Sequence, residues 1–190
     1  MKILIVGGVA GGASAAARLR RLDEQAEIIL FEKGEYISYA NCGLPYYIGD
    51  VIQDRDDLLV QTAAGLSERF NLDVRVFSEV IKINRTAKTV SVHDYQNGRD
   101  YTESYDKLIL SPGAEPKRPP LPGLDLPGIY TLRTIPDTDK IRQAVDVQKA
   151  KSAVVIGGGF IGVEMAENLH ERGLEVTIVE FTDQLVASLD

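Results

Sequence analysis

The chain contains a single cysteine, Cys42, and its surroundings favour a chemical role for the thiol. The stretch Ser38–Tyr47 contains one glycine, three tyrosines and the polar residues Ser38 and Asn41, whereas an inert structural cysteine usually sits among apolar residues. One cysteine cannot form a disulfide within the chain, so a reactive Cys42 would act as a thiolate on another molecule. We expect it at the start of a helical turn, where the helix dipole stabilises a thiolate. A buried structural cysteine is the alternative.

A glycine-rich loop late in the chain predicts a dinucleotide site. Gly157, Gly159 and Gly162 follow the apolar run Ser152–Ile156, and a helical stretch follows them. The first glycine permits a tight turn, the second admits the pyrophosphate, and the third lets helix and strand pack closely. The helix N-terminus then faces the phosphates. Glu180, after the next apolar run, is placed to bind the ribose hydroxyls and to repel the extra phosphate of NADP, which favours NADH.

A second loop of this kind opens the chain. Gly7-Gly8-Val9-Ala10-Gly11-Gly12 follows the apolar run Lys2–Val6, and Glu32, the expected ribose acid, follows Glu27–Phe31. Val9 stands where the second glycine is expected, and Gly8 and Gly11 supply the missing backbone freedom. Two such units in one chain are best explained if one binds a flavin and the other delivers hydride to it.

The elements around these loops predict an α/β protein built on doubly wound parallel sheets. Between the two units we expect the following elements: a helix at Ala63–Phe70, strands at Val74–Ile83, Thr89–Asp94 and Tyr101–Leu110, and a helix at Thr138–Lys149. A hairpin turn is predicted at Gln96-Asn97-Gly98. The second β–α–β unit alone cannot bury both faces of its sheet, so we expect the chain to be a truncated part of a longer protein.

Composition excludes several other classes of function. The net charge of −7 over 190 residues argues against a nucleic-acid binder, and no apolar run approaches the roughly 18 residues of a membrane span. The sequence contains no Cys/His cluster that predicts a metal site and no Ser-His-Asp arrangement. A lone thiol without a recognisable export signal predicts a cytoplasmic protein.

Three motifs together resemble the single-cysteine, coenzyme A-disulfide reductase branch of the FAD-dependent pyridine nucleotide-disulfide oxidoreductase family. They are Gly7–Arg18, the pattern Ser38-x-x-Asn41-Cys42-x-Leu44-Pro45-Tyr46, and Ser104–Ala114. The resemblance implies a Rossmann-like FAD-binding domain over residues 1–150 and the start of a Rossmann-like NAD(P)-binding domain over 151–190. It also implies a later dimerisation domain, and hence a homodimer at full length.

Two positions narrow the function that this resemblance implies. Tyr47 stands where two-cysteine relatives have their second cysteine, and Ala10 where peroxide-reducing relatives have a histidine. Both favour NAD(P)H-dependent reduction of coenzyme A disulfide, or of a coenzyme A persulfide or polysulfide, through Cys42. One alternative is an oxygen-reducing NADH oxidase in which Cys42 cycles through a sulfenic acid. Another is a catalytically silent flavin-binding fragment.

Candidate substrate contacts lie on the first helix. Ser14, Arg18 and Arg21 share one helix face by their spacing, so the arginines could clamp phosphates; a solvated helix face is the alternative. The resemblance assigns these residues, with Ser38 and Asn41, to coenzyme A. A further contact that is basic in relatives aligns with Phe70, beside Arg69.

The resemblance also implies a set of FAD and nicotinamide contacts, in which Phe160 acts as an aromatic gate; core packing is the alternative for this ring. The implied cofactor contacts are Gly7, Val9, Ala10, Gly11, Gly12, Glu32, Lys33, Asn41, Val80, Ser111, Pro112, Gly113, Arg133, Gly157, Gly159, Phe160, Ile161, Gly162, Glu164 and Glu180.

Overall fold

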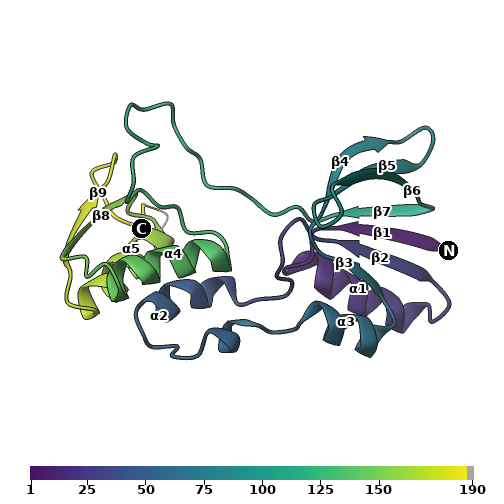
Figure 1. Ribbon diagram of the computed structural model, residues 1–190, viewed down its shortest axis with the longest axis horizontal. Helices are drawn as coiled ribbons and strands as arrows, with labels where there is room; N and C mark the ends of the chain where they lie inside the picture. Colours follow the sequence, from purple (N-terminus) through teal and green to yellow (C-terminus); the bar gives the residue numbers. More distant parts are fainter. Residues whose placement is uncertain (188–190) are drawn as a thin grey trace. The chain divides into compact units, whose positions relative to one another are not determined.

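The structure is a computed structural model that describes residues 1–187 (Figure 1). The chain divides into two compact units. The first comprises Met1–Tyr39 and Leu59–Ala114, and the second Ala40–Leu58 and Glu115–Asp190. These units differ from the division near residue 150 expected from the sequence, and the assignment of 1–150 to FAD and 151–190 to the nicotinamide cofactor stays a prediction.

The first unit is built on a four-stranded parallel sheet in the order β3-β2-β1-β7. Its strands are β1 (Lys2–Val6), β2 (Glu27–Phe31), β3 (Asp73–Arg75) and β7 (Lys107–Leu110). The helices α1 (Gly11–Leu22) and α3 (Ala63–Phe70) cover one face. An antiparallel sheet of β4 (Ser78–Asn84), β5 (Thr89–Asp94) and β6 (Arg99–Ser104) covers the other, as Figure 1 shows.

Alternation along the buried strands explains these two layers. Ile3 and Ile5 of β1 pack toward the helices, and Leu4 between them packs toward the antiparallel sheet, where it meets Val90 and Val92. Successive strand residues point to opposite faces, and here both faces are apolar, as is usual for parallel sheets buried on both sides.

Two segments predicted as single strands are each divided between the two sheets. Val74–Ile83 breaks into β3 and β4 because Phe77 takes a left-handed backbone conformation with φ of 51°. Tyr101–Leu110 breaks into β6 and β7 at Tyr105 and Asp106, where the Asp106 carboxylate accepts a hydrogen bond from the Lys2 backbone amide at 2.7 Å. Neither break contains a glycine or proline, and so the sequence pattern alone did not reveal them.

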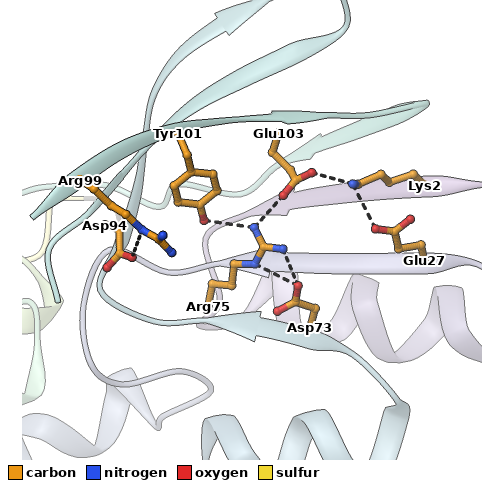
Figure 2. A network of polar contacts seen from close by, with 8 residues as sticks. All are labelled: Lys2, Glu27, Asp73, Arg75, Asp94, Arg99, Tyr101 and Glu103. Atoms are coloured by element: carbon orange, nitrogen blue, oxygen red, sulfur yellow. Dashed lines mark hydrogen bonds and ion pairs between the residues drawn. The ribbon is translucent and has the colours of Figure 1, made fainter. Parts of the chain in front are cut away.

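A polar network ties the two sheets together (Figure 2). Glu103 of β6 accepts hydrogen bonds from Lys2 at 2.6 Å and from Arg75 at 2.7 Å. Arg75 also donates to the Tyr101 hydroxyl at 3.1 Å. Burial acts to raise the pKa of Glu103, but the bonds from Lys2 and Arg75 outweigh it and lower that pKa. The carboxylate is therefore held ionised between strands of different sheets.

The second unit contains the two-stranded parallel pair β8 (Ser152–Ile156) and β9 (Glu175–Val179), together with helices. The helical elements are η1 (Asn41–Gly43), α2 (Leu44–Ile48), η2 (Arg55–Leu58), α4 (Ile135–Asp146) and α5 (Phe160–Glu171). A core of Ile48, Val145, Met165, Leu169 and Leu174 joins α2, α4, α5 and the strand pair.

Two features of the second unit qualify the expectations. The helix predicted from Thr138 begins earlier, at Ile135, because Thr134 and Asp137 form a capping box at its start. Val154, Ile156 and Val179 leave one face of the strand pair exposed, in agreement with the expectation that this β–α–β unit cannot bury both faces. Within residues 1–187, no helix is both long and apolar enough to cross a membrane.

Candidate cofactor, thiol and substrate sites

The first glycine loop leaves β1 through a turn that only glycine fits. Gly7 has a φ of +95°, and a Cβ atom there would lie 2.0 Å from the Ser111 carbonyl oxygen. A Cβ on Gly12 would lie 1.7 Å from the Gly7 carbonyl oxygen. These contacts hold the start of α1 close to β1 and β7, which the third-glycine role requires.

Several of the predicted flavin contacts meet at the carboxyl edge of the parallel sheet. Glu32 follows β2, and its carboxylate accepts hydrogen bonds from the backbone amides of Gly8 at 2.8 Å and Gly34 at 2.9 Å. Ser111 follows β7 and lies against Gly11, where an added Cβ would come within 2.5 Å of the serine Oγ. The chain proceeds from β1 to opposite sides at β2 and β7. Such a switch point is where doubly wound folds bind nucleotides.

An ion pair extends this edge toward the antiparallel sheet. Lys33 pairs with Glu79 at 3.0 Å, and Glu79 accepts a hydrogen bond from the Tyr95 hydroxyl at 2.5 Å. These bonds, led by that from Tyr95, lower the pKa of Glu79. Val80, a predicted FAD contact, is the next residue of β4.

The second glycine loop repeats the geometry of the first. Gly157 has a φ of +103°, and a Cβ on Gly162 would lie 1.9 Å from the Gly157 carbonyl oxygen. Glu180 accepts a hydrogen bond from the Gly158 amide at 2.6 Å, as Glu32 does from Gly8. An added Cβ on Gly159 would meet no atom within 4 Å. The space that a pyrophosphate would need is therefore open.

Glu180 is strongly stabilised as a carboxylate. Hydrogen bonds from the backbone amides of Thr182 and Gly158, together with the Thr182 hydroxyl, lower its pKa to about 2. At neutral pH, this residue therefore presents a full negative charge at the end of β9. Phe160 and Ile161, which open α5, are exposed, so the Phe160 ring is not packed in the core of the described chain.

Both loops have the geometry that dinucleotides need. Each has a positive-φ first glycine, a third glycine pressed against the loop carbonyl, and an acid bonded to the second loop residue. Val9 is the one departure, since it carries a side chain where Gly159 has none. The residues present thus fit a flavin dinucleotide at the first loop and a nicotinamide dinucleotide at the second.

Cys42 lies in the middle of η1 and is exposed to solvent. The turn is held by hydrogen bonds from the Gly43 amide to the Ala40 carbonyl at 2.9 Å and from the Ala40 amide to the Leu58 carbonyl at 2.8 Å. Cys42 thus lies within a helical turn, as predicted, but in its middle and not at its start, and an exposed thiol contradicts the alternative of a buried structural cysteine. Among the described residues, Asn41 Oδ1 is the one buried side-chain polar atom without a hydrogen-bond partner.

A groove of about 410 Å³ in the first unit brings together several predicted substrate contacts. Ser14, Arg21 and Ser38 line it; Arg18 is not among its lining residues, and Asn41 belongs to the other unit. Lining residues that the sequence analysis did not assign to any site include Ala13, Ala17, Tyr39, Val60, Gln61 and Leu66. The spacing of Leu66 and Phe70 on one face of α3 was the available signal for part of this wall.

The charge and the backbone geometry of this groove suit the binding of an anion. The Arg21 and Arg69 guanidinium carbons lie 5.9 and 5.3 Å from the centre of the Phe70 ring, within range of cation–π attraction. Ser38 has a φ of 46°. It is held there because its amide donates to the Gly8 carbonyl and its own carbonyl accepts from the Val60 and Gln61 amides. Strained residues of this kind cluster at functional sites.

The remaining predicted contacts are dispersed in the chain. Pro112 and Gly113 follow Ser111, and Gly113 has a φ of +72°. Arg133 immediately precedes the Thr134 cap of α4, and Glu164 lies on α5.

Two glycine loops of matching geometry, each with its own acid, fit two dinucleotides, and Cys42 is exposed. Comparison with known proteins agrees. The family model for pyridine nucleotide-disulphide oxidoreductases matches residues 1–190. The chain belongs to this family, whose members depend on FAD and NAD(P)H.

Individual relatives are similar along the whole chain. The coenzyme A disulfide reductase of Staphylococcus haemolyticus is 44% identical over 189 residues, covering 100% of this chain and 42% of that protein. Reduced CoADR-RHD of Bacillus anthracis is 59% identical, with a TM-score of 0.97 over 100% of this chain and 34% of that one. The NAD-dependent persulfide reductase from A. fulgidus is 38% identical, with a TM-score of 0.95. The match covers 100% of this chain and 35% of that protein. The chain thus spans less than half the length of these relatives.

Proposed function

We propose that the protein acts, at full length, as an NAD(P)H-dependent flavoprotein reductase of coenzyme A disulfide or of a coenzyme A persulfide. The observation that carries this proposal is the groove beside the first glycine loop. Its arginines, Arg21 and Arg69, and the aromatic ring of Phe70 suit a phosphorylated adenosine nucleotide. The reductases of coenzyme A disulfide and of persulfide among the relatives support the same substrate class.

Cys42 is the proposed redox residue. Its thiolate attacks one sulfur of the substrate disulfide, so the substrate S–S bond breaks and a Cys42–substrate disulfide forms. The departing thiolate takes up a proton. Two electrons, supplied ultimately by NADH, then return Cys42 to a thiolate and release the second thiol. Since Cys42 is the only cysteine, the oxidised form of this chain is a mixed disulfide with the substrate.

The cofactor assignment follows the two loops. Gly7, Gly12, Glu32 and Ser111 would hold FAD, which when bound accepts hydride and passes on electron pairs. Gly157, Gly159, Gly162 and Glu180 would hold the nicotinamide dinucleotide. The negative charge of Glu180 supports NADH over NADPH, because the 2′-phosphate would lie beside a carboxylate with a pKa of about 2.

The wider setting is also part of the proposal. We assign residues 1–150 to the FAD domain and 151–190 to the beginning of the nicotinamide domain, and we propose a homodimer at full length. A thiol that must be a free thiolate at the start of every turnover suits the reducing cytoplasm.

The test uses the full-length protein with FAD bound. NADH oxidation should depend on added coenzyme A disulfide or persulfide, and Cys42→Ser should keep flavin reduction by NADH while losing disulfide turnover. Full turnover by Cys42→Ser would contradict the proposal. Oxygen consumption equal to NADH loss, without any disulfide, would support the oxidase alternative. Ala10 predicts weak peroxide reduction in the same preparation.

A further inference from the structure

The helical segment Asn41–Ile48, which contains Cys42 in its first turn, is held at its other end by two arginines. The turn η1 and helix α2 follow one another directly over Asn41–Ile48, so the Cys42 end and the Tyr47–Ile48 end move together. Arg142 of α4 donates a hydrogen bond to the Tyr47 carbonyl at 2.5 Å. Arg172, at the end of α5, donates to the Ile48 carbonyl at 2.9 Å. These carbonyls lie in the last turn of α2, and the Tyr47 carbonyl also accepts a hydrogen bond from the Asp50 amide at 3.3 Å.

One carboxylate holds both arginines in place. Asp146, the last residue of α4, accepts hydrogen bonds from Arg142 Nε at 3.1 Å and from Arg172. Burial acts to raise the pKa of Asp146, but the bonds from Arg172 and Arg142 outweigh it and lower the pKa. The charge pair therefore persists at neutral pH. We call Arg142, Asp146 and Arg172 the arginine clamp.

The clamp also restrains the rotation of α2. The Arg142 guanidinium carbon lies 4.1 Å from the centre of the Tyr47 ring, and its Nη2 pairs with Asp50 at 2.6 Å. Gly49, which follows α2, lies so close to Asn168 of α5 that an added Cβ would fall 2.0 Å from the amide oxygen. The Tyr47 ring, the Tyr47 and Ile48 carbonyls and the Gly49 backbone are thus all held in contacts at the end of the segment. Cys42, in its first turn, is exposed.

We propose that the arginine clamp positions the Cys42 sulfur for reaction, so that Arg142 and Arg172 are positioning residues of the thiol chemistry. This inference rests on the proposed function, because it assumes that Cys42 reacts with a disulfide. Rotation of Asn41–Ile48 about its own axis would swing the sulfur away from the line of attack, and a misplacement of about 1 Å can cost about 100-fold in rate. Loss of either arginine should lower kcat and leave KM unchanged, because neither arginine lines the groove assigned to the substrate.

The test compares Arg142→Gln and Arg172→Gln with the wild-type full-length holoenzyme. We expect kcat for coenzyme A disulfide to fall about tenfold or more, with KM and the rate of flavin reduction by NADH each within about twofold. Amide hydrogen exchange over Asn41–Ile48 should accelerate well below the melting temperature. Arg172→Lys should recover part of kcat, because lysine can still donate to the Ile48 carbonyl but lacks the fork that also binds Asp146.

Arg75→Gln is the matched control, because it removes a half-buried, multiply bonded arginine from the first unit. It should lower the melting temperature without changing kcat. A normal kcat in both clamp variants, or unchanged hydrogen exchange over Asn41–Ile48, would overturn the inference. Failure of the wild-type enzyme to reduce coenzyme A disulfide or persulfide would instead count against the proposed function.

Discussion

Glu180 and Gly158 are joined by a hydrogen bond of 2.6 Å from the loop amide to the carboxylate, across the second β–α–β unit. The bond fixes the acid beside the loop where a nicotinamide dinucleotide would lie, and it helps keep that acid ionised. Glu32 and Gly8 repeat the relationship at 2.8 Å in the first unit. The acid at the end of the second strand thus also supports the phosphate-binding loop.

This arrangement predicts the choice of nicotinamide cofactor. In Glu180→Ser, the efficiency with NADH should fall about tenfold or more, because charge-assisted hydrogen bonds to the ribose are lost. The efficiency with NADPH should rise or stay constant as the repulsion disappears. Steady-state kinetics with both cofactors measure the ratio, and Glu175→Gln, at the start of β9, is the control. If Glu180→Ser kept the wild-type preference for NADH over NADPH, residues other than Glu180 would determine the choice of cofactor.

The lowered pKa of Glu180 also predicts a pH dependence of stability. A carboxyl whose folded pKa is depressed contributes stability above its unfolded pKa of about 4.3, and this is lost as pH falls through the folded value. For Glu180 that window runs from about pH 4.5 down to about 2. Denaturant midpoints at pH 5 and pH 3 should therefore fall less steeply in Glu180→Gln than in the wild-type protein. An equal fall of the midpoint in both proteins would show that the hydrogen bonds to Glu180 do not contribute to the stability of the fold.

Two neighbouring glycines should separate folding from cofactor binding. Gly162→Ala should destabilise the fold by about 1–3 kcal/mol, because its Cβ would lie 1.9 Å from the Gly157 carbonyl oxygen. Gly159→Ala should leave the melting temperature nearly unchanged, since no atom lies within 4 Å of its Cβ. It should nevertheless weaken NADH binding by crowding the pyrophosphate. Thermal unfolding and fluorescence titration with NADH distinguish the two. Equal stability losses would contradict this assignment of roles.

The two groove arginines, Arg21 and Arg69, should contribute more to substrate binding than Arg18 does. Arg21→Gln and Arg69→Gln are each expected to raise KM for coenzyme A disulfide about tenfold, the usual scale for a lost charge-assisted bond to phosphate. Arg18→Gln should have a smaller effect because Arg18 does not line the groove. Initial-rate kinetics at several salt concentrations measure these effects. If Arg18→Gln proved the most damaging of the three, coenzyme A would have to lie along the exposed face of α1 instead.

The parts of the molecule that are local in sequence were predictable, and the long-range parts were not. Each glycine loop and its acid lie within about one β–α–β unit, so spacing alone identifies them. The turn at Phe77 could not be predicted, because an aromatic residue with positive φ gives no sequence signal. The arginine clamp was equally hidden, since Arg142 and Arg172 reach carbonyls of Tyr47 and Ile48 that are far away in the chain.

The uncovered face of the β8–β9 pair has a practical consequence for handling the 190-residue chain. Val154, Ile156 and Val179 are 65%, 80% and 50% exposed, and apolar strand surfaces of this kind promote self-association. Expressed alone, the chain should form aggregates that bind hydrophobic dyes, even where the first unit is properly folded. Replacing Val154 and Ile156 with threonine would keep the β-propensity of the strand and make its exposed face more polar.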